Sequence, residues 1–429
     1  MKKILFILYT CCILLFPVSA QQIPSFKAND RIVFLGNSIT EGGHYHSYIW
    51  LYYMTHFPEL PLRIYNGGIG GDCASHMVFR FDSDIKIKKP TYLVCSFGMN
   101  DSGYDGYNKP GYDKYANKQV EYANTEFGKL QQQILADKKI KNVVLLGSSP
   151  YDENVKLEGV ETLHGKNETI KRIIEMQAEV AQKRGWGFVN FNTVMCELNK
   201  EIQQSDSTAT FCGGDRIHPD KDGHMVMAYL FLKAQGLAGK EVAYFHINAT
   251  NRKAMEERNC RITHIKNEND TISFSYLSRS LPFPVDTIPR WGTKGTARDA
   301  VRQVPFMQEM NQEIMKVTDL HGNFRVTIDG TEIGRWDGNE LSKGINLAEI
   351  TCTPQYQQSL SIMYLNEERC AIEKRLRQYM AMQYVFFKHR GLLFADNKAA
   401  LDAAKAERES HYLVKYLYTN YTQAMFPQI

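Results

Sequence analysis

The chain has 429 residues, of which 43% are hydrophobic and 23% are charged, and its formal net charge is +4. This composition is typical of globular proteins, and the length indicates two or three domains. A charge surplus this small argues against nucleic acid or an anionic membrane surface as the main partner.

The chain begins with a pattern typical of a secretory signal peptide. Lys2 and Lys3 precede the apolar run ILFILYTCCILLF, which is followed by PVSAQQ. A basic start, a short apolar stretch and a small-residue cleavage site predict that residues 1–20 are removed after Ala20. We therefore expect an exported protein, periplasmic or extracellular. The alternative, an N-terminal membrane anchor, is disfavoured by the length of the run, and no other segment is a candidate membrane span.

Residues 21–238 alternate between short apolar runs and longer amphipathic stretches. The runs, rich in β-branched, leucine and aromatic residues, are RIVFLG, LRIYNGG, TYLVCSFG, NVVLLGSSP and GFVNF. Nearly continuous apolar runs are typical of strands buried on both faces, and strands alternating with helices predict a parallel sheet covered on both sides. One helix is expected at 167–185, with Asn167 capping its start and Gly185 ending it. The last helix of this domain is expected at 224–237.

The remaining residues fall into two regions with different predicted secondary structure. Residues 239–355 contain short strand patterns, and the segment 324–336 predicts a hairpin with Asp329-Gly330 at its turn. Residues 356–429 have a helical composition interrupted by HRGLLFADN, which predicts a helical hairpin. Neither region has a catalytic motif, and the hairpin is expected either at the active-site rim or in dimerisation.

Seven cysteines follow the predicted signal peptide, and none belongs to a C-x-x-C pair. Export permits disulfides, but a chain of this length does not depend on them for a core. We therefore expect buried free thiols that behave as small apolar side chains.

Polar residues and glycines follow the predicted strands at their carboxyl ends, where open parallel sheets bind ligands. Ser38 follows the first strand, the segment NGGIGGD (66–72) the second, and GMND (98–101) the third. Asp215 and His218 come near the end of the domain.

Each of these features also has a structural explanation. Ser38 and Glu41 form the S-x-x-E pattern of a capping box, and glycines fit tight turns. Together, however, they supply a nucleophile, a base, a group to orient the base and oxyanion donors. Pro219 disfavours a helix at His218, and Asp215 lies close enough along the chain to bond the imidazole. The combination predicts acyl transfer.

The segments GNSIT, GGIGGD, GMND and DRIHPDKDGH resemble, in order and spacing, the four blocks of the SGNH (GDSL-like) hydrolases. The resemblance covers about residues 28–237 and implies a three-layer α/β/α sandwich that needs no metal or cofactor. It also implies roles for particular residues. These are Ser38 as nucleophile, His218 as base, Asp215 as the group that orients the base, and the oxyanion donors Ser38 N–H, Gly71 N–H and the Asn100 side-chain amide.

The chain departs from the family pattern at Asn37, where the first block usually has an aspartate. Asparagine keeps the short hydrogen-bonding geometry and loses the charge. Because this acid is not a member of the triad, we expect activity to survive, while any electrostatic tuning of Ser38 is in doubt.

The substrate is predicted from the loop after the third block, DSGYDGYNKPGYDKYANK. Tyr104 and Tyr107 would offer aromatic platforms to a sugar ring, unless they pack on neighbouring helices instead. With export, this loop favours a serine esterase that removes O-acetyl groups from glycans. The alternatives are a lysophospholipase or short-chain acyl esterase or thioesterase, and a non-catalytic glycan-binding or scaffold protein on a hydrolase fold. The sequence does not indicate an oligomeric state.

Overall fold

The computed structural model describes residues 22–269, 271–289 and 294–425, so the predicted signal peptide (1–20) lies outside the described residues. Five strands form a parallel sheet in the order β2-β1-β3-β4-β5, and they coincide with the five predicted runs. They are β1 (Arg31–Gly36), β2 (Arg63–Gly68), β3 (Tyr92–Phe97), β4 (Asn142–Gly147) and β5 (Gly187–Asn190). Because β1 lies between β2 and β3, the chain order reverses there. The carboxyl ends of these strands meet at a topological switch point.

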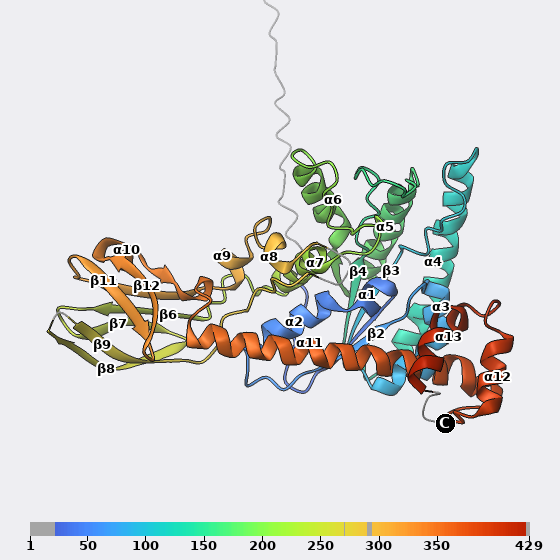
Figure 1. Ribbon diagram of the computed structural model, residues 1–429. Coiled ribbons are helices and arrows are strands. Elements are labelled where there is room, and N and C mark those ends of the chain that lie inside the picture. The colour runs from blue at the N-terminus through green and yellow to red at the C-terminus, as the bar shows by residue number, and fades with distance from the viewer. Residues whose placement is uncertain (1–21, 270, 290–293, 426–429) are drawn as a thin grey trace, which may run out of the picture.

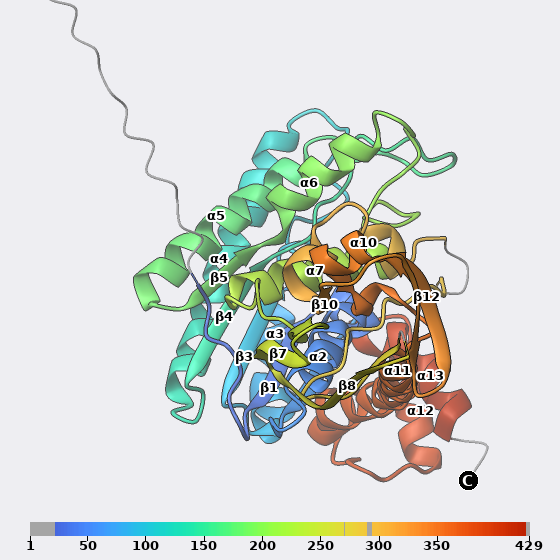
Figure 2. The same cartoon turned by 90° about the vertical axis from the view of Figure 1, so that its left-hand side faces the viewer.

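Helices cover both faces of this sheet, which makes the predicted three-layer α/β/α sandwich (Figure 2). Ile32 and Phe34 of β1 point into a core shared with α2, α6 and α7, whereas Val33 and Leu35 point into a second core shared with α3 and α4. The helices are α1 (Ser38–Gly42), α2 (His44–His56), α3 (Ala74–Arg80), α4 (Tyr112–Ala136), α5 (Lys166–Arg184), α6 (Phe191–Ile202) and α7 (Lys221–Ala234).

The predicted N-cap of one helix, Asn167, is wrong by two positions, and the hydrogen bonds of Asn167 explain the difference. Gly165 occupies the N-cap position of α5, and Asn167 lies inside the first turn. The Asn167 side chain instead accepts a hydrogen bond from the Tyr151 N–H at 3.2 Å. The other end agrees with the prediction, since Gly185 ends the helix in the left-handed region with φ 66°.

The second part of the chain contains the predicted short strands. They form a four-stranded sheet in the order β13-β10-β6-β7 and two hairpins, β8–β9 and β11–β12. The β11–β12 hairpin turns at Asp329 and Gly330, whose φ values are 49° and 82°, as its sequence predicts. The strands are β6 (Ala243–Asn248), β7 (Lys253–Arg258), β8 (Cys260–Glu268), β9 (Thr271–Ser278), β10 (Glu313–Thr318), β11 (Asn323–Ile328), β12 (Thr331–Asp337) and β13 (Ile345–Asn346).

A segment between β9 and β10 packs on the first domain. Phe283, Phe306 and Met310 are fully buried, and they belong to the core on the α2 and α7 side of the sheet. The segment includes α8 (Ala297–Ala300) and α9 (Phe306–Met310), and a further short helix, α10 (Gly338–Lys343), follows β12. The β-rich residues are therefore attached to the sandwich through a shared hydrophobic core.

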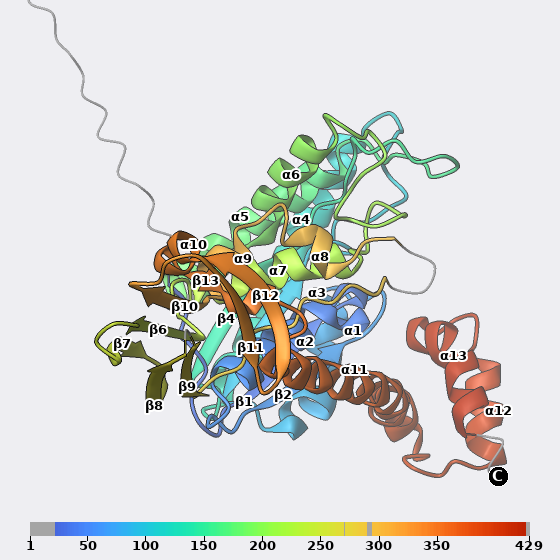
Figure 3. The ribbon, with the colours of Figure 1, turned by 60° about the vertical axis from the view of Figure 1, so that its left-hand side comes forward.

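The C-terminal residues form one long helix followed by two shorter helices that run back along its end. Helix α11 (Pro354–Ala381) leads from the β-rich region, past α2, to the edge of the sheet at β2 (Figure 1). The helix continues as a π-helical turn (Met382–Phe387) and a 3₁₀ turn (Lys388–Arg390). The chain then returns through α12 (Lys398–Ala406) and α13 (Tyr412–Met425), which pack on the end of α11 (Figure 3).

Among the described residues no helix is long and apolar enough to cross a bilayer, and no cluster of side chains is suited to a metal ion. All seven described cysteines are free. Cys95 and Cys212 are buried as expected, whereas Cys352 is exposed and the others are half-buried.

Candidate active site

Ser38 begins α1 directly after β1, but it does not cap the helix. The cap is Asn37, whose side-chain oxygen accepts a hydrogen bond from the Ile39 N–H at 3.0 Å. The capping-box interpretation of Ser38 and Glu41 is therefore wrong. Because Asn37 supplies the cap, the Ser38 hydroxyl is available for another partner. Asn37, which replaces the aspartate of the family pattern, thus makes the capping hydrogen bond without carrying a charge.

That partner is His218, 180 residues further along the chain. His218 Nε2 lies 2.8 Å from Ser38 Oγ, and His218 Nδ1 lies 2.5 Å from Asp215 Oδ2. An imidazole whose Nδ1–H donates to the carboxylate leaves Nε2 to accept the serine proton. Asp215 also accepts the backbone N–H groups of Ile217 and His218. Although partial burial opposes it, the hydrogen bonds from His218 hold the pKa of Asp215 below its usual value.

The loop that carries Asp215 and His218 is fixed by the residue between them, Arg216. This side chain is only 3% exposed, and its backbone is left-handed with φ 69°. The guanidinium donates to the carbonyls of Val155 at 2.5 Å and Asp152 at 3.1 Å. The sequence contains no signal for this anchor, because both carbonyls lie about 60 residues away along the chain.

The predicted oxyanion donors lie on the loops after β2 and β3. Gly71 is exposed with φ 79°, and no atom lies within 4 Å of where a Cβ would stand. The Asn100 side-chain nitrogen donates one hydrogen bond to the Asp72 carbonyl at 2.9 Å, which links the two loops. The Asn100 side-chain oxygen accepts the Tyr104 hydroxyl at 2.8 Å, so the orientation of the amide is defined.

The loop after β3 is held by Lys166, which sequence reasoning missed. This fully buried ammonium donates to the Met99 carbonyl at 2.9 Å, and to the Ser102 hydroxyl and Gly103 carbonyl at 2.6 Å. It also lies 3.8 Å from the centre of the Tyr104 ring. Burial lowers the pKa of Lys166 to about 7. A lysine at a helix start usually faces solvent, so no sequence pattern predicts that Lys166 is buried.

The two tyrosines predicted to contact sugar have other contacts. Tyr107 is 2% exposed and donates its hydroxyl to the Ser102 carbonyl at 2.7 Å, so it presents no platform to a ligand. Tyr104 is half-buried, with its hydroxyl on Asn100 and its ring against Lys166. Tyr107 is thus packed in the interior, and Tyr104 supports Asn100, which the sequence predicts to be an oxyanion donor.

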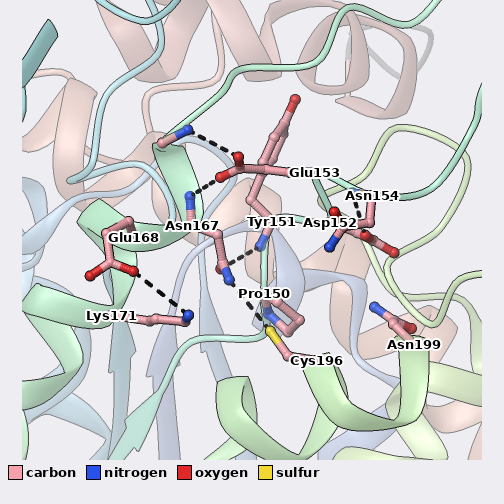
Figure 4. Close-up of a pocket in the computed structure, with 11 residues that line it drawn as sticks. Pro150, Tyr151, Asp152, Glu153, Asn154, Asn167, Glu168, Lys171, Cys196 and Asn199 are labelled. Atoms are coloured by element: carbon pink, nitrogen blue, oxygen red, sulfur yellow. Dashed lines mark hydrogen bonds and ion pairs between the residues drawn. The ribbon is translucent and has the colours of Figure 1, made fainter. Parts of the chain in front are cut away.

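A polar cavity of about 240 Å³ lies between the segment after β4 and the helices α5 and α6 (Figure 4). It is lined by Pro150, Tyr151, Asp152, Glu153, Asn154, Gly165, Asn167, Glu168, Lys171, Cys196 and Asn199. The Asp152 N–H donates to the Arg216 carbonyl at 3.0 Å, so the cavity wall adjoins the loop of Asp215 and His218. The cavity does not include Ser38.

A serine, an imidazole and a carboxylate hydrogen-bonded in a row at the edge of a parallel sheet define the class of serine hydrolases. The model of the GDSL-like lipase/acylhydrolase family matches residues 34–226, and that of the diltiazem deacetylase C-terminal helical domain matches residues 360–429. The chain belongs to the GDSL-like lipase/acylhydrolase family and is an ester hydrolase, which confirms the resemblance seen in its sequence.

Two relatives illustrate this membership. A solved structure of a gut microbial diltiazem-metabolizing enzyme is 48% identical, has a TM-score of 0.90, and covers 95% of this chain and 92% of its own. An acetylxylan esterase of Geobacillus stearothermophilus is 22% identical over 224 residues, which are 49% of this chain and 95% of that protein. A solved structure of that acetylxylan esterase has a TM-score of 0.38 at 20% identity, covering 49% of this chain and 95% of its own.

Proposed function

We propose that this enzyme removes O-acetyl groups from alcohols through an acyl-serine intermediate. The observation that carries the proposal is the continuous row of hydrogen bonds from Ser38 through His218 to Asp215. In this proposal Ser38 is the nucleophile, His218 is the general base and Asp215 holds the imidazole in the useful tautomer.

The reaction has two halves. Ser38 Oγ attacks the ester carbonyl carbon as His218 Nε2 takes its proton, and the carbonyl electron pair moves to the oxygen. The intermediate then expels the alcohol, which receives the proton from His218, and acetyl-serine remains. In the second half His218 takes a proton from water, the resulting hydroxide attacks the acetyl group, and acetate leaves as Ser38 regains its proton.

The negative oxygen of each tetrahedral intermediate needs donors that are already in place. We assign the backbone N–H groups of Ser38 and Gly71 and the side-chain amide of Asn100. Two observations support the assignment: the space is free where a side chain at position 71 would stand, and hydrogen bonds fix the Asn100 amide at both ends.

The acetyl group is proposed from the relatives, since one is an acetylxylan esterase and the matched C-terminal domain takes its name from a deacetylase. For the alcohol we propose an acetylated glycan first. The polar cavity beside the catalytic loop suits a hydroxyl-rich group, and export, if residues 1–20 are a signal peptide, would bring the enzyme to such substrates. A drug-like acetate such as diltiazem is the second candidate, favoured by the 48% identity to a diltiazem-metabolizing enzyme.

Acetate release tests the proposal directly. The purified enzyme is assayed on acetylated xylan, mucin and bacterial glycans, on diltiazem, and on chromogenic esters with acyl chains of increasing length. Ser38→Ala is the matched control, and its rate should fall by at least about 10³-fold. Full activity in Ser38→Ala would overturn the assignment of the nucleophile. Faster cleavage of long acyl chains or of a lysophospholipid would overturn the acetyl proposal.

A further inference from the structure

The loop after β2, which carries Gly71, packs against the C-terminal helices. Ile69 is 2% exposed and belongs to the hydrophobic core formed by the end of α11, α12 and α13. The ring of Tyr416 lies so close to Gly70 that a Cβ at Gly70 would stand 2.4 Å from Tyr416 Cζ. The catalytic domain and the C-terminal helices therefore meet at the two residues that precede the proposed oxyanion donor.

Glu41 connects the two sides of this contact. Its side chain is 3% exposed and comes from α1, the helix that Ser38 begins. Oε2 accepts the Gly70 N–H at 2.7 Å and the Tyr416 hydroxyl at 2.8 Å, while Oε1 accepts the Gln378 amide at 2.8 Å. Gln378 lies in α11 and Tyr416 in α13, so one carboxylate holds the loop after β2 with the help of both C-terminal helices.

The position of Gly71 depends largely on these contacts, because its other contacts are few: its carbonyl accepts the Cys73 thiol at a long 3.9 Å and a hydrogen bond from His76. Gly71 is exposed, with no neighbour where a side chain would be. The peptide unit is planar, so once the Gly70 N–H and the Ile69 side chain are fixed, few rotations remain before the Gly71 N–H. A carboxylate is a strong acceptor for a backbone N–H, and in a buried site such a bond is well defined in geometry.

A series of buried ion pairs also connects α11 with the loop after β2. Arg377 is paired with Asp84 at 2.5 Å, Asp84 with Arg80 at 2.6 Å, and Arg80 with Asp72 at 2.6 Å. These side chains are 0–3% exposed. The Asp72 carbonyl is the acceptor of the Asn100 amide. The loop is thus held on both sides of Gly71 by groups that α11 and α13 help to place.

We propose that Glu41 is a positioning residue through which Tyr416 and Gln378 of the C-terminal helices hold the Gly71 N–H in place for the oxyanion. The inference rests on the proposed function of Gly71 as an oxyanion donor. In this inference the C-terminal helices support the reaction by holding an oxyanion donor in place, although none of their residues contacts the substrate.

Steady-state kinetics on the chromogenic ester that the wild type cleaves fastest test this inference, whichever acyl chain that ester carries. The loss of an interaction made only in the transition state lowers kcat and leaves KM unchanged. Glu41→Ala should lower kcat by about 10- to 100-fold, because small misplacements of a donor have effects of this size. Tyr416→Phe, which loses one hydrogen bond, should lower kcat by about 3- to 10-fold.

Two matched variants separate positioning from simple loss of packing. Glu41→Gln keeps an oxygen that accepts the Gly70 N–H and the Tyr416 hydroxyl, so kcat should stay within about threefold of the wild type. Tyr412→Phe makes the same change as Tyr416→Phe on the same helix. The Tyr412 hydroxyl has no hydrogen-bond partner among the described residues, so its loss should leave kcat unchanged.

The inference is overturned if Tyr416→Phe keeps the wild-type kcat, whether or not Glu41→Ala folds. It is also overturned if the variants raise KM at constant kcat, or if Tyr412→Phe lowers kcat as much as Tyr416→Phe. A preference of the wild type for long acyl chains would overturn only the acetyl proposal, because the comparison of variants is made on the preferred ester.

Discussion

The two loops that carry the proposed oxyanion donors are fixed by different parts of the chain. The loop after β3, with Asn100, is held from within the catalytic domain by Lys166 at the start of α5. The loop after β2, with Gly71, is held by Glu41 of the catalytic domain together with residues of α11 and α13, which lie outside that domain.

The difference follows from where each loop lies in the sheet. β3 is an inner strand, so helices of the same domain surround its carboxyl end, whereas β2 is an edge strand. A loop at the edge has no neighbouring strand on one side, and here α11 to α13 occupy that side (Figures 1 and 3). Both proposed donors need a fixed position. The position of Asn100 is fixed by contacts within the catalytic domain, whereas that of Gly71 is fixed with the help of the C-terminal helices.

The comparison is tested most strongly by removing the donor that a side chain supplies. Asn100→Ala should lower kcat by about 10²–10³-fold, the usual effect of losing one oxyanion donor. Single-turnover measurements should show the loss in the acylation step, with the affinity for substrate unchanged. A kcat within threefold of the wild type would show that Asn100 does not contact the oxyanion.

Removing the internal support should have the next largest effect. Lys166→Met removes the donor of the Gly103 carbonyl, and an unsatisfied buried group costs about 1–3 kcal/mol, whereas the Met99 carbonyl still accepts the Ser102 hydroxyl. We expect a lower free energy of unfolding in urea and a kcat reduced by about 10-fold or more as the loop shifts. A stable Lys166→Met enzyme with unchanged kcat would contradict the proposed support.

The stability of the wild type and that of Lys166→Met should depend differently on pH. Burial lowers the pKa of Lys166 to about 7 in the folded state, while the unfolded chain keeps this proton up to its ordinary value of 10.5. Between these values the unfolded state binds more protons, so the stability of the wild type rises with pH. Relative to Lys166→Met, the wild type should gain up to about 1.4 kcal/mol per pH unit in that window and nothing below it. Urea unfolding of both proteins at pH 6, 7, 8 and 9 measures this gain, and a constant difference would refute the shift.

The smallest expected effect is on the orientation of the Asn100 amide. Tyr104→Phe removes the hydroxyl that fixes the amide oxygen, while the bond to the Asp72 carbonyl remains. We expect kcat to fall by about 3- to 10-fold with KM unchanged, in line with one hydrogen bond. Tyr107→Phe is the matched control, because its hydroxyl bonds Ser102 and not Asn100. Equal losses in both variants would mean that the loop as a whole, and not the amide, had moved.

The parallel sheet could be predicted because strands buried on both faces leave continuous apolar runs in the sequence. The residues at the ends of those strands could be predicted for the same reason, since the sheet brings Ser38 and the loops of Gly71 and Asn100 to one edge. The N-cap residue of α1 could not be predicted, because Asn37 and Ser38 are both good N-cap residues and stand at adjacent positions.

The supports of the site could not be predicted for a different reason. Glu41 and Tyr416 are 375 residues apart in sequence, and Glu41 and Gln378 are 337 apart. No periodicity or local motif records a contact of this length. Lys166 shows the same difficulty, because nothing in its neighbourhood distinguishes a buried lysine from an exposed one.

The close approach of Tyr416 to Gly70 also constrains how this protein can evolve. A side chain at position 70 would occupy the space of the tyrosine ring, so a substitution there requires the Tyr416 ring to move. Tyr416 is 46% exposed, so the ring can turn toward solvent while α13 stays in place, but its hydrogen bond to Glu41 is then lost. An alignment of close relatives should therefore show glycine at position 70 and an aromatic residue at position 416 gained and lost together.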